Sequence, residues 1–351
     1  YLVSDKVLCH GSACPVEFTP TKQQRILIAS GRPVYHNPQC ARDACKVRHG
    51  KRNLLPTKGS RENNTFREMK LEVDALYPPL PERPNVLISR SIVSCCWHVP
   101  FTSMDSLNLL LQVARKENIK DLIIGGDFFD LYGLSRFRVY HEHPTLVDEL
   151  VMGAKIVKLL AEQFDRIHLM PGNHDLRIAK TFYDLSRTDK GKQMIDVLRK
   201  VISPVPEDLA DLDVSAWQLI EFVIGNPRLK MYRYSELMVN NKWLVIHPAN
   251  YSRQSPTVER ALSAKYRTSV IGCGSHAMSM GFDLSGQDVV ASIGFMADAR
   301  KLEYLKVNPT TLPVMNGGFG VLRTDEDSPQ GWLQLVSTGN RLMTSRKAFQ
   351  K

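Results

Sequence analysis

The chain has 351 residues, of which 43% are hydrophobic and 23% charged, which is ordinary for a globular protein with room for a large core. No apolar run approaches the roughly 20 residues of a membrane span, and we expect no signal peptide. The net charge is +10, and residues 1–70 carry most of it, with 13 Lys or Arg against 5 Asp or Glu. This excess predicts a polyanionic partner for the N-terminal segment, unless it is only a solvated basic face.

The N-terminal segment contains two pairs of possible metal ligands. Cys9 and Cys14 form the first pair, His36 and Cys40 form the second, and Cys45 competes as a fourth ligand. A few residues inside each pair suit a tetrahedral structural zinc, and the pattern resembles treble-clef or ribbon-type zinc modules. The alternative is a set of free thiols. Seven cysteines, an odd number, fit a reduced cytoplasmic compartment better than a disulfide scaffold.

Basic residues follow the second ligand pair closely: Arg42, Lys46, Arg48, Lys51 and Arg52. Such a cluster favours contacts to the phosphates of DNA or RNA, which hold a nucleic acid without reading its sequence. We therefore expect residues 1–57 to be a zinc-binding basic module. Residues 58–85, which end in a Pro-rich run, predict a linker. The main domain is expected over 86–340, with a tail at 341–351.

The main domain shows alternating strand and helix patterns. Residues 85–94 predict its first strand, and residues 103–118 carry apolar side chains at helical spacing. Residues 121–124 are a short branched apolar run that ends at two glycines, which is typical of a buried strand. Residues 145–164 predict a helix, and residues 166–170 predict the next strand. The pattern indicates an α/β fold with a β-α-β crossover.

Polar side chains follow two of these strands directly: Asp127, Asp130, Asn173, His174 and Asp175. In an open α/β sheet the ligand crevice lies beyond the carboxyl ends of the strands, so these side chains should converge there. Carboxylate and amide oxygens together with imidazoles suit divalent ions such as Mn, Zn, Fe or Mg. The sequence therefore predicts a metal site at this edge of the sheet.

The stretches Gly126–Asp130 and Gly172–Asp175 read GDxxD and GNHD. With them, the chain from Val86 to about Thr338 resembles the calcineurin-like metallophosphoesterase family. The resemblance implies a four-layer α-β-β-α sandwich. Apolar residues predict a helical insertion over about residues 190–225. Residues 288–295, 318–323 and 332–337 predict strands of a second sheet.

The resemblance also implies a ligand set for two divalent metal ions. Asp127 would be shared, His98 and His276 would complete the first site, and Asn173 and His247 would complete the second. Two positions depart from the family pattern. Cys96 stands where the family has Asp, and it is either a ligand that favours softer metals or a buried cysteine beside a weakened site. Gly274 stands where the family has His, so one ligand is missing.

The resemblance implies hydrolysis of a phosphate ester by a metal-bound hydroxide. His174 would protonate the leaving oxygen, Asp175 would orient its imidazole, and Asp130 would support the loop. Arg177 and Arg253 are candidate phosphate clamps. The basic module favours a nucleic acid or nucleotide as substrate. The alternatives are a phosphatase of small molecules or phosphoproteins, and a nucleic-acid-binding protein whose phosphoesterase fold is degenerate and weakly active or inactive.

Overall fold

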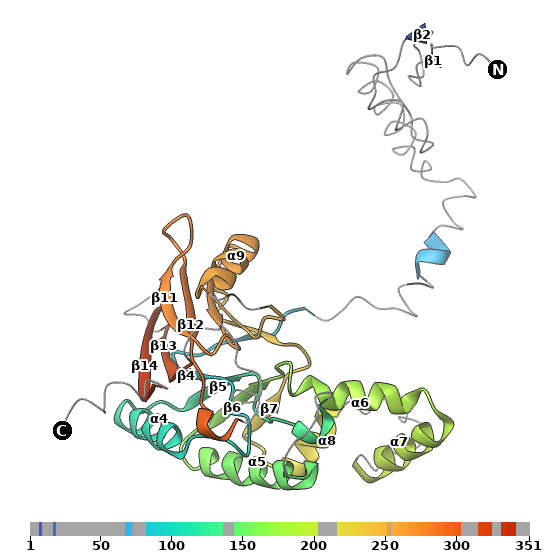
Figure 1. Ribbon diagram of the computed structural model, residues 1–351, viewed down its shortest axis with the longest axis horizontal. Coiled ribbons are helices and arrows are strands. Elements are labelled where there is room, and N and C mark those ends of the chain that lie inside the picture. Colours follow the sequence, from blue (N-terminus) through green and yellow to red (C-terminus); the bar gives the residue numbers. More distant parts are fainter. Residues whose placement is uncertain are drawn as a thin grey trace. The chain divides into compact units, whose positions relative to one another are not determined.

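The computed structural model describes residues 82–135, 144–202, 216–250, 252, 254–302, 315–324 and 331–341, with short N-terminal pieces at 7–8, 17–18, 67–71 and 73. The chain divides into two units, Tyr1–Pro81 and Glu82–Lys351. In the first unit, β1 (Val7–Leu8) pairs antiparallel with β2 (Glu17–Phe18) (Figure 1). The predicted zinc ligands Cys9, Cys14, His36 and Cys40 lie outside the described residues, so the zinc module stays a prediction.

The second unit contains two six-stranded mixed sheets. The first has the order β14-β13-β4-β5-β6-β7. Four of its strands run parallel, namely β4 (Arg90–Ser94), β5 (Asp121–Gly125), β6 (Arg166–Met170) and β7 (Leu229–Met231). The strands β13 (Asn316–Arg323) and β14 (Trp332–Arg341) extend it in antiparallel fashion beside β4.

The second sheet has the order β11-β12-β10-β9-β8-β3. Its strands are β3 (Asn85–Val86), β8 (Glu236–Val239), β9 (Trp243–Ile246), β10 (Ser269–Gly272), β11 (Met278–Phe282) and β12 (Val289–Ile293). The neighbours β9, β10 and β12 run parallel. Their carboxyl ends therefore meet at one edge, as those of β4, β5 and β6 do in the first sheet.

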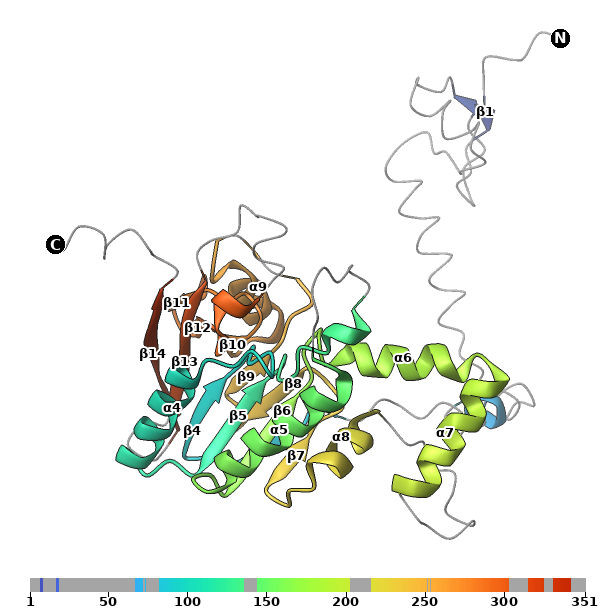
Figure 2. The same cartoon turned by 60° about the horizontal axis from the view of Figure 1, so that its bottom comes forward.

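The two sheets pack face to face. Val93 and Ile123 of the first sheet meet Val245 and Ile271 of the second in one buried cluster. On the outer face of the first sheet lie α4 (Met104–Lys116), α5 (Leu146–Ala161) and α8 (Ala216–Ile224). The helix α9 (Thr257–Tyr266) covers the outer face of the second (Figures 1 and 2). The layers are thus helix, sheet, sheet, helix.

The crossover helix α5 begins where the sequence provides a capping box. The side chain of Thr145 accepts the N–H of Asp148, and the Asp148 carboxylate accepts the N–H of Thr145, which satisfies two amides that the first turn leaves open. Beyond β6 comes α6 (Leu176–Ser186), which precedes the helical insertion expected over residues 190–225. The helices α7 (Asp189–Ile202) and α8 lie in that insertion. Two short 3-10 turns are also described, η1 (Tyr132–Leu134) and η3 (Ala299–Lys301).

Two expectations about strands were wrong. Residues 85–94 are not one strand, because β3 belongs to the second sheet and β4 to the first. Residues 318–323 and 332–337 belong to β13 and β14 in the first sheet, and only residues 288–295 lie in the second, as β12. The pattern of apolar residues predicts which segments are strands, but partners far apart in sequence are selected by packing.

Within the described part of the chain, no helix has the length and apolar character needed to cross a bilayer.

Candidate metal centre

The loops that follow five strands meet at the carboxyl edge of the two sheets. Cys96 and His98 follow β4, and Asp127 and Asp130 follow β5. Asn173 and His174 follow β6, while His247 directly follows β9 and His276 lies shortly after β10. A crevice at this edge is the usual ligand site of α/β sheets.

The backbone turns sharply at the residues that face this centre. Cys96, His98, Asp127 and His276 have positive φ values of 54°, 46°, 51° and 55°. A positive φ is uncommon for residues other than glycine and tends to persist where a site requires it. The first two loops are also tied together, because the N–H of Cys96 donates to the carbonyl of Gly126 at 2.9 Å and that of His98 donates to Asp127 at 3.0 Å.

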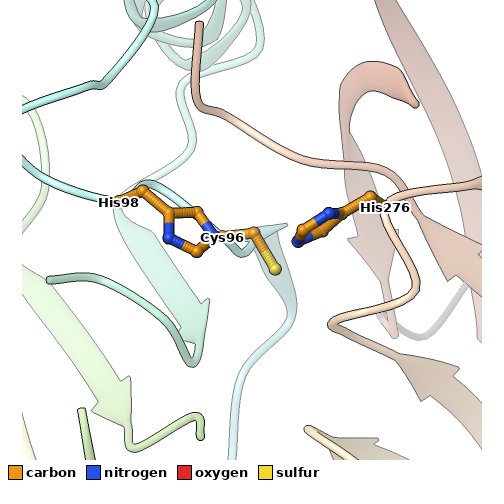
Figure 3. Close-up of side chains that lie close together, drawn as sticks. All are labelled: Cys96, His98 and His276. Atoms are coloured by element: carbon orange, nitrogen blue, oxygen red, sulfur yellow. The ribbon is translucent and has the colours of Figure 1, made fainter. Parts of the chain in front are cut away.

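The side chains form three overlapping groups, in each of which the ligand atoms lie within 4.8 Å of one another. The groups are Cys96 with His98 and His276, Cys96 with Asp127 and His247, and His98 with Asp127 and His174. The Cys96 sulfur lies between the rings of His98 and His276 (Figure 3). Because Cys96 and Asp127 each belong to two groups, they link the His98 side of the centre to the His247 side.

His98 is fully buried, and its two ring nitrogens differ. Nδ1 lies 2.8 Å from Oδ1 of Asp130, whereas Nε2 is buried without a hydrogen-bond partner among the described residues. Buried polar atoms normally have partners. Since metal-bound histidines commonly hold a carboxylate with their other nitrogen, a divalent ion on Nε2 fits this arrangement.

His247 is buried with both ring nitrogens in contact. Nδ1 lies 2.9 Å from the carbonyl of Gly125, and Nε2 lies 3.2 Å from Oδ1 of Asn173 and 3.3 Å from Oδ2 of Asp127. Burial opposes the charge on His247, but Asp127 outweighs it and raises the pKa of His247 to about 9. Burial also opposes ionisation of Asp127, yet His247 and His174 hold the pKa of that carboxyl well below its ordinary value.

Residues 96–267 match the family model of the calcineurin-like phosphoesterases. This segment is a calcineurin-like phosphoesterase domain. The match begins at Cys96 and ends just before β10, so it includes Asp127, Asn173 and His247 and stops short of His276. The family is one of metal-dependent hydrolases, with which the grouped ligand atoms agree.

Similar solved structures include a variant of Vps29 from Entamoeba histolytica, at 10% identity and a TM-score of 0.35, over 71% of this chain and 98% of that one. Vps29 from Chaetomium thermophilum is 11% identical with a TM-score of 0.33, over 71% and 95%. Vacuolar protein sorting 29 from Cryptosporidium parvum is 8% identical with a TM-score of 0.34, over 71% and 97%. Values this low carry no argument about function. No curated protein sequence matches the chain.

The sequence had led us to expect that Asp175 orients the ring of His174. In the phosphoesterase domain Asp175 has other partners. Its carboxylate accepts the backbone N–H groups of Gly172 at 2.8 Å, Phe129 at 3.0 Å and Phe128 at 3.3 Å. The ring of His174 instead places Nδ1 3.0 Å from Oδ1 of Asp130. Asp130 therefore holds both His174 and His98, while Asp175 joins the two metal-binding loops.

The two predicted phosphate clamps have different outcomes. Nη1 of Arg177 donates to the carbonyl of Asp130 at 2.7 Å and to that of Leu131 at 3.4 Å, and Nη2 lies 3.4 Å from Nε2 of His174. Arg177 is half-buried beside His174, with much of its hydrogen-bonding capacity directed at the loop. Arg253 lies outside the described residues, so its role stays a prediction.

Gly274 leaves no room for the ligand that the family pattern has at its position. Its φ is +99°, and a Cβ atom built on it would lie 2.7 Å from Nε2 of His247. That distance is shorter than real Cβ atoms show. Residues other than glycine also rarely adopt this backbone conformation. A histidine here would require both the turn and His247 to move.

Sequence reasoning missed Glu149, which holds the loop behind the centre. This α5 side chain is fully buried and accepts the N–H of Leu131 at 2.5 Å and that of Tyr132 at 3.1 Å. Burial raises the pKa of Glu149 to about 7. A signal was present, because Glu149 interrupts the apolar face formed by Leu146 and Leu150, and a charge inside such a stripe calls for a partner.

Proposed function

We propose that this chain is a metal-dependent phosphoesterase that hydrolyses a phosphate ester in a nucleic acid or nucleotide. The observation that carries the proposal is the convergence of ligand side chains from the strand-end loops of two sheets around His98, whose Nε2 is buried without a hydrogen-bond partner in the described part of the chain. Family membership of residues 96–267 supports the same reaction class. The proposed ligands are Cys96, His98, Asp127, Asn173, His247 and His276.

When bound, divalent ions at such a site activate a water and draw charge from the phosphate oxygens. The chain would orient the ester and supply a proton to the leaving oxygen. His174 suits that step, since 14% of its side-chain surface remains exposed and its Nδ1 is fixed by Asp130. Although burial opposes it, Asp127 and Asp130 raise the pKa of His174, so the ring holds its proton closer to neutral pH than a free histidine does.

The substrate class rests on charge. The excess of Lys and Arg in residues 1–70 favours a polyanion, and a zinc module there would bring it to the domain. Polynucleotide affinity should therefore fall steeply with salt and fall again when a chelator is added. Binding that ignores both would remove the nucleic acid from the proposal and favour a phosphatase of small molecules or phosphoproteins.

A second candidate is a nucleic-acid-binding protein with a degenerate, inactive centre. The departures at Cys96 and Gly274 favour it, because each replaces a residue that the family pattern uses as a ligand. The test is hydrolysis of a model diester, bis(p-nitrophenyl) phosphate, by the metal-loaded full chain. Absence of turnover of this diester and of the monoester p-nitrophenyl phosphate, with Zn²⁺, Mn²⁺ and Mg²⁺ alike, would select this candidate over the enzyme.

The role of His174 has a sharper test. His174→Ala should lower kcat by about 10²–10⁴-fold, the usual contribution of a general acid, for an ester with an alkyl leaving group. The loss should be much smaller for a p-nitrophenyl ester, because p-nitrophenolate leaves without needing a proton. Equal losses for both esters would contradict proton donation and indicate a role in binding.

A further inference from the structure

Cys96 changes the chemistry of the ion that this centre would hold. Carboxylate oxygens suit hard ions such as Mg²⁺ and Mn²⁺, whereas a thiolate with imidazoles suits zinc. Cys96, His98 and His276 place one sulfur and two ring nitrogens within 4.8 Å of one another (Figure 3). Zinc sites that carry out chemistry commonly have three protein ligands and keep one position open.

The three side chains come from loops that are fixed before any ion arrives. Cys96 and His98 are fully buried, and their backbone N–H groups donate to the β5 loop. Asp130 holds Nδ1 of His98, so the ring can offer Nε2 to an ion, and no described residue hydrogen-bonds that atom. His276 approaches from the second sheet, with its ring 5.6 Å from that of His98 and nearly perpendicular to it.

The His247 side of the centre is less complete. Its own donors are His247 and Asn173, with Asp127 and Cys96 between the two sides. Asn173 is exposed, and Gly274 provides no side chain and has no space for one. Nε2 of His247 already contacts Asn173 and Asp127, so an ion there would have to displace existing contacts.

We infer that Cys96, His98 and His276 form a thiophilic site that binds one zinc-type ion tightly and in preference to Mn²⁺ or Mg²⁺, while a second ion binds weakly. Asp127 stands near enough to Cys96 and His98 to add an oxygen ligand. The inference rests on the proposed function only in taking this ion to be the one that the phosphoesterase reaction uses.

The experiment measures metal binding to the full chain by chelator competition and by the absorption of the Co²⁺-substituted protein. A thiolate ligand gives Co²⁺ an intense near-ultraviolet charge-transfer band. Cys96→Ser should remove part of that band and weaken zinc binding by more than about tenfold, since even the loss of a group that only supports a ligand costs ~10–100-fold. Cys96→Asp should reduce the difference between the affinities of the chain for Zn²⁺ and for Mn²⁺.

Cys273→Ser is the matched control, because Cys273 is also buried and lies near the same sheet edge. It should keep the band and the zinc affinity of the unmodified chain. Cysteines in residues 1–57 can bind Co²⁺ themselves, so the readout is the difference between each variant and the unmodified chain. If Cys96→Ser does not fold, His276→Asn provides a second test at a half-buried position, where zinc affinity should fall while the thiolate band persists.

A band that Cys96→Ser leaves unchanged would overturn the inference, and so would equal affinity of the unmodified chain for Mn²⁺ and Zn²⁺. Hydrolysis of bis(p-nitrophenyl) phosphate, measured in parallel, separates the two proposals. Turnover with Mn²⁺ and no Cys96-dependent band would contradict the thiophilic site alone. An intact Cys96-dependent band without turnover under any metal would contradict the phosphoesterase function alone.

Discussion

His98 and His247 reach the candidate centre from different sheets and are held in different ways. Nδ1 of His98 contacts the Asp130 carboxylate, and Nε2 is buried without a partner among the described residues. Both nitrogens of His247 have contacts, to Gly125 on one side and to Asn173 and Asp127 on the other. A buried unpartnered nitrogen is costly until a ligand arrives. An ion on the His98 side therefore relieves a penalty, whereas one on the His247 side must first break contacts.

The largest effect should come from the carboxylate that both sides share. Asp127→Asn should lower kcat/KM by more than the ~10–100-fold that the loss of a group supporting a metal ligand costs. Asn tolerates the positive φ at this position, so the thermal melting temperature should change little. Hydrolysis of bis(p-nitrophenyl) phosphate measures the effect.

Asp165→Asn is the control for Asp127→Asn, because Asp165 is exposed and directly precedes β6, at the edge of the sheet opposite the carboxyl ends of the strands. It should leave both activity and metal content unchanged. Activity retained by Asp127→Asn would mean that the two sides do not share a ligand.

The comparison between the two sides is tested directly by His98→Asn and His247→Asn. The first should remove the tightly bound ion, and the second should leave that ion in place while it lowers turnover. Elemental analysis after dialysis, together with the hydrolysis rate, distinguishes them. Equal losses of metal in the two variants would show that the sides are equivalent.

A smaller effect is expected from the carboxylate behind His98. Asp130→Asn should weaken zinc binding by ~10–100-fold, because it loosens His98, and should also lower kcat, because it releases His174. Asp175→Asn is the matched comparison. It should lower the free energy of unfolding by about 1–3 kcal/mol, since its carboxylate accepts three backbone N–H groups. If Asp175→Asn impaired zinc binding as much as Asp130→Asn, it would be wrong that Asp130 holds the histidines while Asp175 only joins the loops.

The smallest effect on turnover should come from Glu149, whose effect on the free energy of unfolding should depend on pH. Burial raises its pKa to about 7, with Asp130 adding to the rise and Arg177 opposing it. Since the folded pKa lies above the unfolded value near 4.5, the contribution of Glu149 to stability is present below about pH 4.5 and is lost as the pH rises through 7. The change is on the order of 3 kcal/mol.

Glu149→Gln should therefore approach the stability of the unmodified chain as the pH rises, as measured by urea denaturation at pH 5 and pH 8. Kinetic effects should remain small, because the Glu149 carboxylate accepts the N–H groups of Leu131 and Tyr132 and does not belong to the three groups of ligand side chains. Glu162→Gln, an exposed change just after the same helix, is the control. If the difference in the free energy of unfolding between Glu149→Gln and the unmodified chain did not vary with pH, the raised pKa of Glu149 would be contradicted.

Much of the centre was predictable because its motifs are local. GDxxD and GNHD each lie directly after an apolar run, and parallel strands must end at the same edge, so Asp127 and Asn173 had to be close. His98, His247 and His276 followed from the resemblance to the calcineurin-like family, which has ligands at matching places along the chain. Asp130 and Asp175 could not be told apart in this way, since both are acids at a loop and their partners are set by how the loops fold.

The sequence by itself determined most of the strand segments, the crossover helix and the donor types, including the thiol of Cys96, because these follow from residue identity and local periodicity. The missing ligand at Gly274 followed from the resemblance to the family. Only the tertiary structure decided that β13 and β14 join the first sheet, that Asp130 holds two histidines and that Glu149 supports their loop. Those outcomes depend on contacts between segments far apart in sequence, which are selected by burial and hydrogen bonding in the packed protein.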